Sequence, residues 1–210
     1  MEIVWYGLNT FRLSERGMAS VVTDPYDPSV GLTFSKPRAD IITISRDDPQ
    51  CKYTRGVRGP YMTLETPGEY EIGGVFITGI ATHKKKSTWV NTIFHYDYDG
   101  LNICHLGHMD HLPSQTQVEA LGTVDVLLVP VGGDSGLKPA QAAEIISLLE
   151  PSIVIPMRYK IPKLELSLGT LGRFLKQMGL EKEAPEESLK VTKRGLPSQT
   201  EIVVLSPRVG

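Results

Sequence analysis

The spacing of hydrophobic residues changes near Pro113, and this change restricts the folds open to the chain. Before it, short segments of alternating or apolar character end at Gly, Pro, Asp or Ser, as β-strands do. After it, segments with a period of about 3.6 residues, typical of helices, alternate with short apolar runs. Strands followed by alternating helices and strands suit two sheets packed face to face with helices outside. The sequence therefore predicts an α/β (α+β) sandwich.

Turn and capping residues give the expected element boundaries. Gly73-Gly74 and Asp99-Gly100 are two-residue signals for hairpin turns, so each is expected to join two antiparallel strands. Pro139 near the start of one helical segment and Gly179 after another are typical helix boundary residues. We expect a hairpin over 68–80, further strands at 2–6, 10–13, 19–23, 40–44, 92–98, 101–106, 124–129, 152–156 and 202–205, and helices at 114–121, 139–149 and 166–178.

Length and composition are those of an ordinary globular protein. The chain has 210 residues, 40% hydrophobic and 22% charged, and we expect a single domain over residues 1–210. A net charge of −2 and a pI near 6.2 give no general electrostatic reason to expect nucleic-acid or membrane partners. Lys84-Lys85-Lys86 is the only basic run, and three lysines in a loop between strands are usually solvated.

The first residues and the cysteine content indicate a cytoplasmic protein. The start of the sequence lacks the basic and then apolar pattern of a signal peptide, and no stretch is long and apolar enough to span a membrane. Two cysteines, Cys51 and Cys104, are too few for a disulfide framework. Both observations agree with a reducing compartment.

The run at residues 39–51 has the form of a strand that presents ligands to a metal ion, because it is β-rich and ends in spaced polar residues. The polar residues are Arg46, Asp48, Gln50 and Cys51, and the run contains no histidine. Arginine cannot donate a lone pair to a metal, because its guanidinium group stays protonated. The mixture therefore favours charge pairing over the binding of zinc or iron.

A series of short segments between about residues 1 and 160 keeps a characteristic order and spacing. They are Trp5-Tyr6-Gly7, Thr23-Asp24-Pro25, Gly68-Glu69-Tyr70-Glu71, Asn91-Thr92-Ile93-Phe94, Ile103-Cys104-His105-Leu106-Gly107, Asp125-Val126-Leu127-Leu128-Val129-Pro130 and Ile155-Pro156-Met157. In these segments the chain resembles the metallo-β-lactamase fold superfamily, in the branch of small metal-dependent hydrolases related to L-ascorbate-6-phosphate lactonase. The resemblance implies a four-layer α-β-β-α sandwich with mixed sheets.

The resemblance also implies where metal ligands would lie. The family uses a His-x-His-x-Asp-His loop, a later His, a bridging Asp and a final His. The corresponding positions here are Arg46, Asp48, Gln50 and Cys51 for the loop, Lys84 or His83 for the later His, His108 for the bridging Asp and Arg158 for the final His, and Leu8 stands where a histidine often follows the first strand. None of these positions keeps the usual residue, which indicates a degenerate metal site.

Three of the replacements are cations, and they suggest a different use for the cleft. Arg46, Lys84 and Arg158 would place fixed positive charge where the family holds metal ions, with Asp48 as a counter-charge. We expect either an anion-binding site or an internally satisfied network of ion pairs. The first hypothesis for function is therefore a pseudoenzyme, a non-catalytic binding or scaffold protein with a cationic cleft, a small anionic ligand and no cofactor.

The second hypothesis is a metal-dependent hydrolase with an altered ligand set. Asp48, Cys51 and His108, with His83 or His111, offer carboxylate, thiolate and imidazole groups for Zn or Mn. The substrate implied by the resemblance is a small phosphorylated or lactone-like molecule. Like charge from the neighbouring arginines opposes a metal at this place. The resemblance also allows a homo-oligomer.

The Thr-Asp-Pro-Tyr-Asp-Pro segment carries two further carboxylates, Asp24 and Asp27. Asp before Pro usually builds turns and caps. We expect both residues to be structural.

Overall fold

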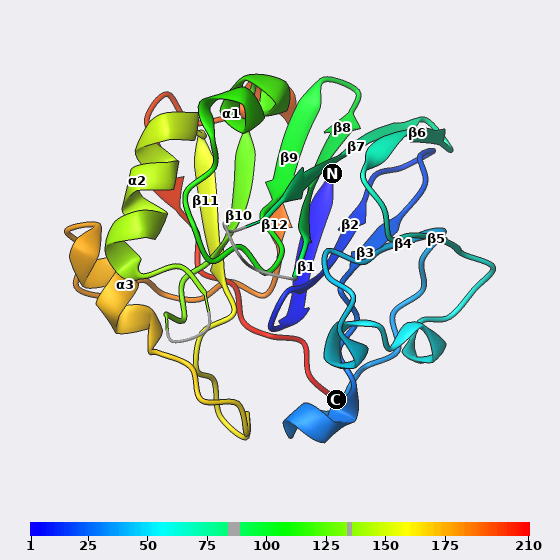
Figure 1. Ribbon diagram of the computed structural model, residues 1–210, viewed down its shortest axis with the longest axis horizontal. Helices are drawn as coiled ribbons and strands as arrows, with labels where there is room; N and C mark the ends of the chain where they lie inside the picture. Colours follow the sequence, from blue (N-terminus) through cyan, green and yellow to red (C-terminus); the bar gives the residue numbers. More distant parts are fainter. Residues whose placement is uncertain (84–88, 134–135) are drawn as a thin grey trace.

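Two mixed β-sheets packed face to face form the centre of the computed structural model, which describes residues 1–83, 89–133 and 136–210 apart from the side chain of Gln50 (Figure 1). The six-stranded sheet has the order β12-β1-β2-β3-β4-β5, and the seven-stranded sheet has the order β13-β11-β10-β9-β8-β7-β6. The strands are β1 Glu2–Gly7, β2 Thr10–Ser14, β3 Val21–Thr23, β4 Ile41–Thr43, β5 Met62–Leu64, β6 Gly68–Ile72, β7 Val75–Thr82, β8 Asn91–Tyr98, β9 Leu101–His105, β10 Val126–Pro130, β11 Ile153–Met157, β12 Leu189–Lys190 and β13 Glu201–Ile202.

The core lies between the sheets and is rich in aromatic side chains. Trp5 and Phe11 of the first sheet and Phe94 and Tyr96 of the second are fully buried. The hydroxyl of Tyr96 lies 2.6 Å from Thr43 Oγ1, so a polar contact joins the sheets inside this apolar layer. Buried hydroxyl groups need such partners, because an unpaired one costs about 1–3 kcal/mol. The contact helps to fix how the sheets dock.

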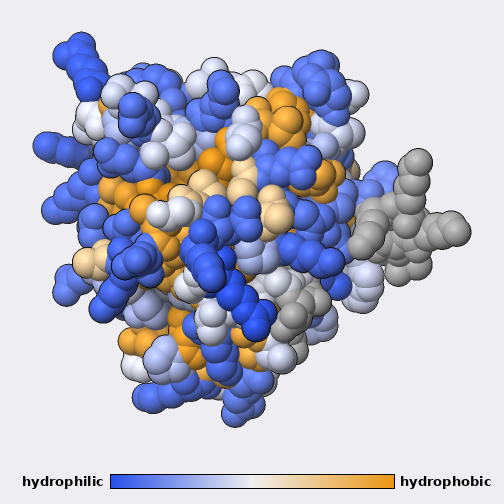
Figure 2. Space-filling model, turned by 90° about the vertical axis from the view of Figure 1, so that its left-hand side faces the viewer, coloured by the Kyte–Doolittle hydropathy of each residue, from blue (hydrophilic) through white to orange (hydrophobic). Residues whose placement is uncertain are grey.

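Three α-helices, α1 Gln115–Leu121, α2 Pro139–Leu149 and α3 Leu171–Gln177, follow β9 in the chain and lie along the outer side of the seven-stranded sheet (Figure 1). They explain why every residue of β10 and β11 is buried, since these parallel strands are covered on both faces. Figure 2 shows this helical side, where apolar side chains lie between hydrophilic ones, and Leu148 of α2 is exposed there.

Short 3-10 helices make up the remaining helical structure of the described residues. They are η1 Pro28–Val30, η2 Pro49–Cys51, η3 Thr54–Gly56 and η4 Lys193–Gly195. No helix of the described residues is long and apolar enough to cross a membrane.

The predicted mixed-sheet sandwich is confirmed, with differences in detail. The Gly73-Gly74 hairpin forms as expected, with both glycines at positive φ. Strand β5 was not predicted. The helix predicted over 166–178 begins only at Leu171, because the backbone before it is bonded elsewhere. The Gly169 N–H donates to the Gly132 carbonyl and the Gly169 carbonyl accepts from Lys160 N–H, so this segment follows neighbouring loops and does not form a helical turn.

The ends of five strands meet at one edge of the sandwich, and the residues just beyond them come close together. Leu8, Asp24 and Arg158 directly follow β1, β3 and β11, Ser45 is the second residue after β4, and His108 is the third residue after β9. Both sheets therefore contribute to this edge.

Candidate functional site at the strand ends

A small cavity lies at this edge, between the two sheets. Its lining residues are Leu8, Asn9, Asp24, Tyr26, Val30, Asp48, Cys51, His108, Arg158 and Leu166. The space open to the centre of a water molecule is about 20 Å³. One water needs roughly 10–15 Å³ on this measure, so the cavity can hold one small group, such as a single inorganic ion or the end group of a larger molecule.

Three lining residues have left-handed backbone conformations that side chains other than glycine rarely adopt. Their φ angles are +50° for Leu8, +37° for Asp24 and +53° for Arg158. The Arg158 N–H donates to the Leu8 carbonyl at 3.2 Å, which ties two of the strained residues together. Such conformations cost of order 1–3 kcal/mol each and cluster at functional sites. Their concentration here marks the cavity as a candidate site.

Asn9 is held firmly at the base of the cavity. Its backbone carbonyl accepts hydrogen bonds from Thr23 Oγ1 at 2.6 Å and His105 Nε2 at 2.9 Å. His105 therefore carries its proton on Nε2, and burial lowers its pKa to about 4, so the imidazole is neutral at physiological pH. The Asn9 side chain is 1% exposed.

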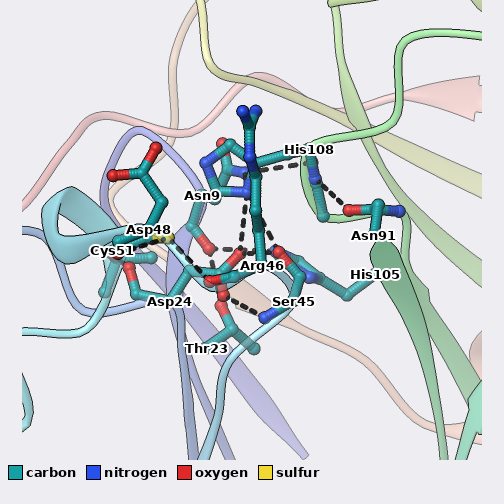
Figure 3. A network of polar contacts seen from close by, with 12 residues as sticks. Asn9, Thr23, Asp24, Ser45, Arg46, Asp48, Cys51, Asn91, His105 and His108 are labelled. Atoms are coloured by element: carbon teal, nitrogen blue, oxygen red, sulfur yellow. Dashed lines mark hydrogen bonds and ion pairs between the residues drawn. The ribbon is translucent and has the colours of Figure 1, made fainter. Parts of the chain in front are cut away.

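The Asn9 amide fixes the state of His108 (Figure 3). Asn9 Nδ2 lies 3.0 Å from the Gly107 carbonyl oxygen and 3.1 Å from His108 Nδ1. A carbonyl can only accept, so the NH2 end of the amide must face it, and His108 Nδ1 is then an acceptor. Burial, and after it the charges of Arg158 and Arg46, hold the pKa of His108 well below its usual value. His108 is a neutral imidazole with its proton on Nε2.

Asp24 is buried beside Ser45 in the same network (Figure 3). Its carboxyl group accepts from the Ser45 N–H at 2.6 Å and lies 2.6 Å from Ser45 Oγ. Burial raises the pKa of Asp24 to about 7, although the hydrogen bonds from Ser45 and from the Asn9 side chain and the charge of Arg158 act in the opposite direction. Near neutral pH, Asp24 is close to half protonated.

The single Ser45 hydroxyl proton can serve His108 Nδ1 only when Asp24 carries a proton of its own. Ser45 Oγ lies 3.0 Å from His108 Nδ1, which accepts, so the single Ser45 hydroxyl proton is needed there. Ser45 Oγ then accepts from a protonated Asp24. If Asp24 is ionised, the Ser45 hydroxyl donates its proton to the Asp24 carboxylate. The Ser45 oxygen then has no proton to donate to His108 Nδ1, and the two acceptors face each other. The geometry and the raised pKa of Asp24 agree.

Gly107→Ala is expected to lower the free energy of unfolding by about 2–4 kcal/mol. Gly107 has φ +61°, and a Cβ there would lie 2.5 Å from Ser45 Cβ and 2.6 Å from Asn91 Oδ1, which accepts from the His108 N–H. Gly122→Ala is the matched control, because Gly122 has φ +59° with no atom within 4 Å. Urea unfolding of both variants separates the cost of the overlap of the new Cβ with its neighbours from the cost of the positive φ, which both variants share. Equal losses of unfolding free energy would show that the neighbours of Gly107 move to accommodate the Cβ.

Two arginines supply positive charge at the cavity. Arg158 lines it, and no hydrogen bond or ion pair of its guanidinium group is present within the described residues. Burial lowers the pKa of Arg158, and the positive charge of Arg46 adds to this. The Arg46 guanidinium lies 4.4 Å from the ring centroid of Trp89, and its Nε is buried without a hydrogen-bond partner. Both arginines therefore keep donors that described residues do not satisfy.

The candidate metal ligands do not assemble into a metal site. Asp48, Cys51 and His108 line the cavity, but His83 is exposed and His111 pairs with Asp110, and neither is a lining residue. Burial raises the pKa of the Cys51 thiol, as do Asp24 and Asp48, so the thiol stays protonated and donates to backbone carbonyls. Over residues 1–83, 89–133 and 136–210, no three His, Cys, Asp or Glu side chains are placed to hold a metal ion.

The structure brings some predicted residues together and separates others. Arg46 and Arg158 converge as expected, whereas Lys84 lies outside the described residues. Asp48 acts on Arg158 as the expected counter-charge, because its charge raises the pKa of the guanidinium group against the effect of burial. Which of these side chains come together depends on how the strand ends are arranged in the fold. The spacing of the residues in the sequence does not give this arrangement.

Sequence reasoning missed the polar base of the cavity. Asn9 and Ser45 were not singled out, and Asp24 was expected only to build a turn. Asp27 does cap η1, as expected, by accepting from the Ser29 N–H at 2.9 Å. A signal was present for Asn9, because a polar residue directly after Gly7 and Leu8 at a strand end is well placed to face a cleft.

Comparison with known proteins agrees with the fold. The family model described as beta-lactamase superfamily domain matches residues 2–158. The chain belongs to the beta-lactamase superfamily. A protein of the metallo-beta-lactamase superfamily from Thermotoga maritima, known from a crystal structure, is 32% identical with a TM-score of 0.80, and the match covers 97% of both chains.

Some relatives of the chain are named as metal-dependent hydrolases. A UPF0173 protein of Pyrococcus furiosus is 26% identical over 76% of this chain and 83% of its own length. A UPF0173 metal-dependent hydrolase of Thermococcus kodakarensis is 33% identical over 44% of each chain. The superfamily and the sandwich predicted from sequence motifs are thus confirmed.

Proposed function

We propose that the cavity of this superfamily member is a non-catalytic anion-binding site, in which arginine side chains take the electrostatic place of metal ions. The observation that carries the proposal is the Arg158 guanidinium group, which lines the cavity and keeps donors free of any described residue. Arg158 is half-buried, and desolvation lowers its pKa, so a bound anion would offset the free energy that its charge costs there. The strained backbone of Arg158 supports the same conclusion.

The names of the relatives suggest metal-dependent hydrolysis as the other candidate function. The donor set does not fit this function. Cys51 is a protonated thiol, His108 Nδ1 already accepts from Asn9, and Arg158 adds a repelling charge beside both. A bound metal needs deprotonated thiolate, free imidazole nitrogen and little neighbouring positive charge.

Metal content separates the two candidate functions. Protein purified without chelators is expected to contain far less than one metal ion per chain by mass spectrometry, and EDTA is expected to leave its melting temperature unchanged. Low millimolar phosphate should raise the melting temperature with saturation, because a ligand that binds only the folded state stabilises it. Stoichiometric Zn or Mn, with a lower melting temperature after its removal, would instead support the hydrolase.

Sodium chloride of equal ionic strength controls for general salt effects, which do not saturate at low concentration. If phosphate behaves as chloride does, the proposed anion site is wrong.

A further inference from the structure

The cavity presents a hydrogen-bond acceptor as well as donors. Asn9 Oδ1 is buried and has no hydrogen-bond partner among the described residues. The amide cannot turn to avoid this, because its Nδ2 is held by the Gly107 carbonyl and His108 Nδ1. An acceptor of this kind costs about tenfold or more in an equilibrium unless something donates to it.

The donor side of the cavity comes from Arg158, whose guanidinium group lines it. Arg46 does not line the cavity, but its positive charge acts on Arg158 and His108. Guanidinium groups donate to ionised oxygens of phosphate or carboxylate. The site therefore fits a ligand that accepts hydrogen bonds on one side and donates a hydrogen bond on another.

We infer that the cavity selects an oxyanion that carries its own proton, namely hydrogen phosphate as a free ion or as the end group of a monoester, over one that carries none. This inference rests on the proposed anion-binding function. Ionised phosphate oxygens accept from Arg158, and the P–O–H group donates to Asn9 Oδ1. The Asp48 carboxylate, which also lines the cavity, adds repulsion against an anion without a proton.

Sulfate is the informative competitor, because it is tetrahedral like phosphate but has no proton near neutral pH. With sulfate bound, Asn9 Oδ1 would face an oxygen and stay unsatisfied. A site built around a hydrogen bond rejects ligands that lack the donor much more strongly than ligands that differ only in size. We expect phosphate to bind at least about tenfold more tightly than sulfate.

The test is isothermal titration calorimetry of the unmodified protein at constant ionic strength and about pH 5, which is about one unit below the second pKa of phosphate esters, so that phosphate and methyl phosphate both keep a proton. Four anions are compared: phosphate and methyl phosphate, which carry a P–O–H group, and sulfate and dimethyl phosphate, which do not. We expect both members of the first pair to bind more tightly than both members of the second. Tighter binding of methyl phosphate than of phosphate would assign the monoester end group, preference for phosphate would assign the free ion, and equal affinity would show that the site takes both.

Two results would count against the inference, and they are distinguishable. If phosphate and sulfate bind with equal affinity, selection by the proton is wrong while the anion site stands. If none of the four anions binds, the proposed function itself fails.

Asn9→Leu locates the selecting group. In a variant that circular dichroism shows to be folded, the ratio of phosphate to sulfate affinity is expected to fall to near one. Asn102→Leu is the matched control, since Asn102 donates to Gly100 and Asp125 and does not line the cavity. It should keep the ratio of the unmodified protein. A folded Asn9→Leu protein that keeps a tenfold ratio would remove Asn9 from the selecting role.

Discussion

Arg158→Met is expected to weaken phosphate binding by about a hundredfold or more and at the same time to raise the free energy of unfolding. The loss follows from removing at least two charge-assisted hydrogen bonds to the anion, at about 1.5–3 kcal/mol each. The gain, of about 1–2 kcal/mol, follows because methionine fills a similar volume without a buried charge that described residues leave unpaired. The left-handed backbone is retained in both proteins.

Calorimetric titration with phosphate and urea unfolding measure the two effects separately. Arg194→Met is the matched control, because Arg194 is exposed in η4 and lies outside the cavity. The Arg194→Met variant loses the same charge and should change neither the phosphate affinity nor the free energy of unfolding by much. A less stable Arg158→Met protein that still binds phosphate would show that Arg158 is there for the fold alone.

Asp24→Asn is expected to gain stability relative to the unmodified protein as pH rises from about 4 to about 7, by a few kcal/mol. Burial raises the folded pKa of Asp24 from 3.8 to about 7, so in this window the folded protein binds a proton that the unfolded chain has released. The contribution of Asp24 to the free energy of unfolding of the unmodified protein is therefore lost as pH rises through this window. The loss is about 1.4 kcal/mol for each unit by which the folded pKa exceeds the unfolded one. Asparagine stays neutral, donates to Ser45 Oγ as the protonated acid does, and tolerates positive φ.

Urea unfolding of both proteins across this pH range gives the difference directly, and contributions of His105 and His108 cancel in it. Asp40→Asn is a control of opposite sign. Hydrogen bonds from Ser20 lower the pKa of Asp40, so its stabilisation is present at neutral pH and lost on acidification below about pH 4. A difference for Asp24→Asn that does not change with pH would mean that Asp24 stays ionised in the folded protein.

The fold was largely readable from the sequence, because its signals are local. The Gly73-Gly74 turn, the change of period near Pro113 and the apolar runs of β10 and β11 each specify an element by neighbouring residues. The start of α3 was misjudged because backbone bonds from Gly169 to distant loops replace a helical turn. Such bonds leave no periodic trace.

The site was readable only in part. Motif order placed Arg158, His108 and Cys51 at strand ends that meet, and they do line one cavity. Asn9 and Ser45 escaped notice because their importance lies in contacts with His108, which is far away in the chain. The protonation of Asp24 likewise depends on burial created by both sheets.

The bond between the Arg158 N–H and the Leu8 carbonyl crosses from one sheet to the other, and the cavity is divided in the same way. Asn9 and Asp24 belong to the first sheet, and His108 and Arg158 belong to the second. Neither half of the chain can assemble the cavity during synthesis or refolding, so the ability to hold an anion arises only when the halves dock. Binding of the ligand therefore reports that the two sheets have docked.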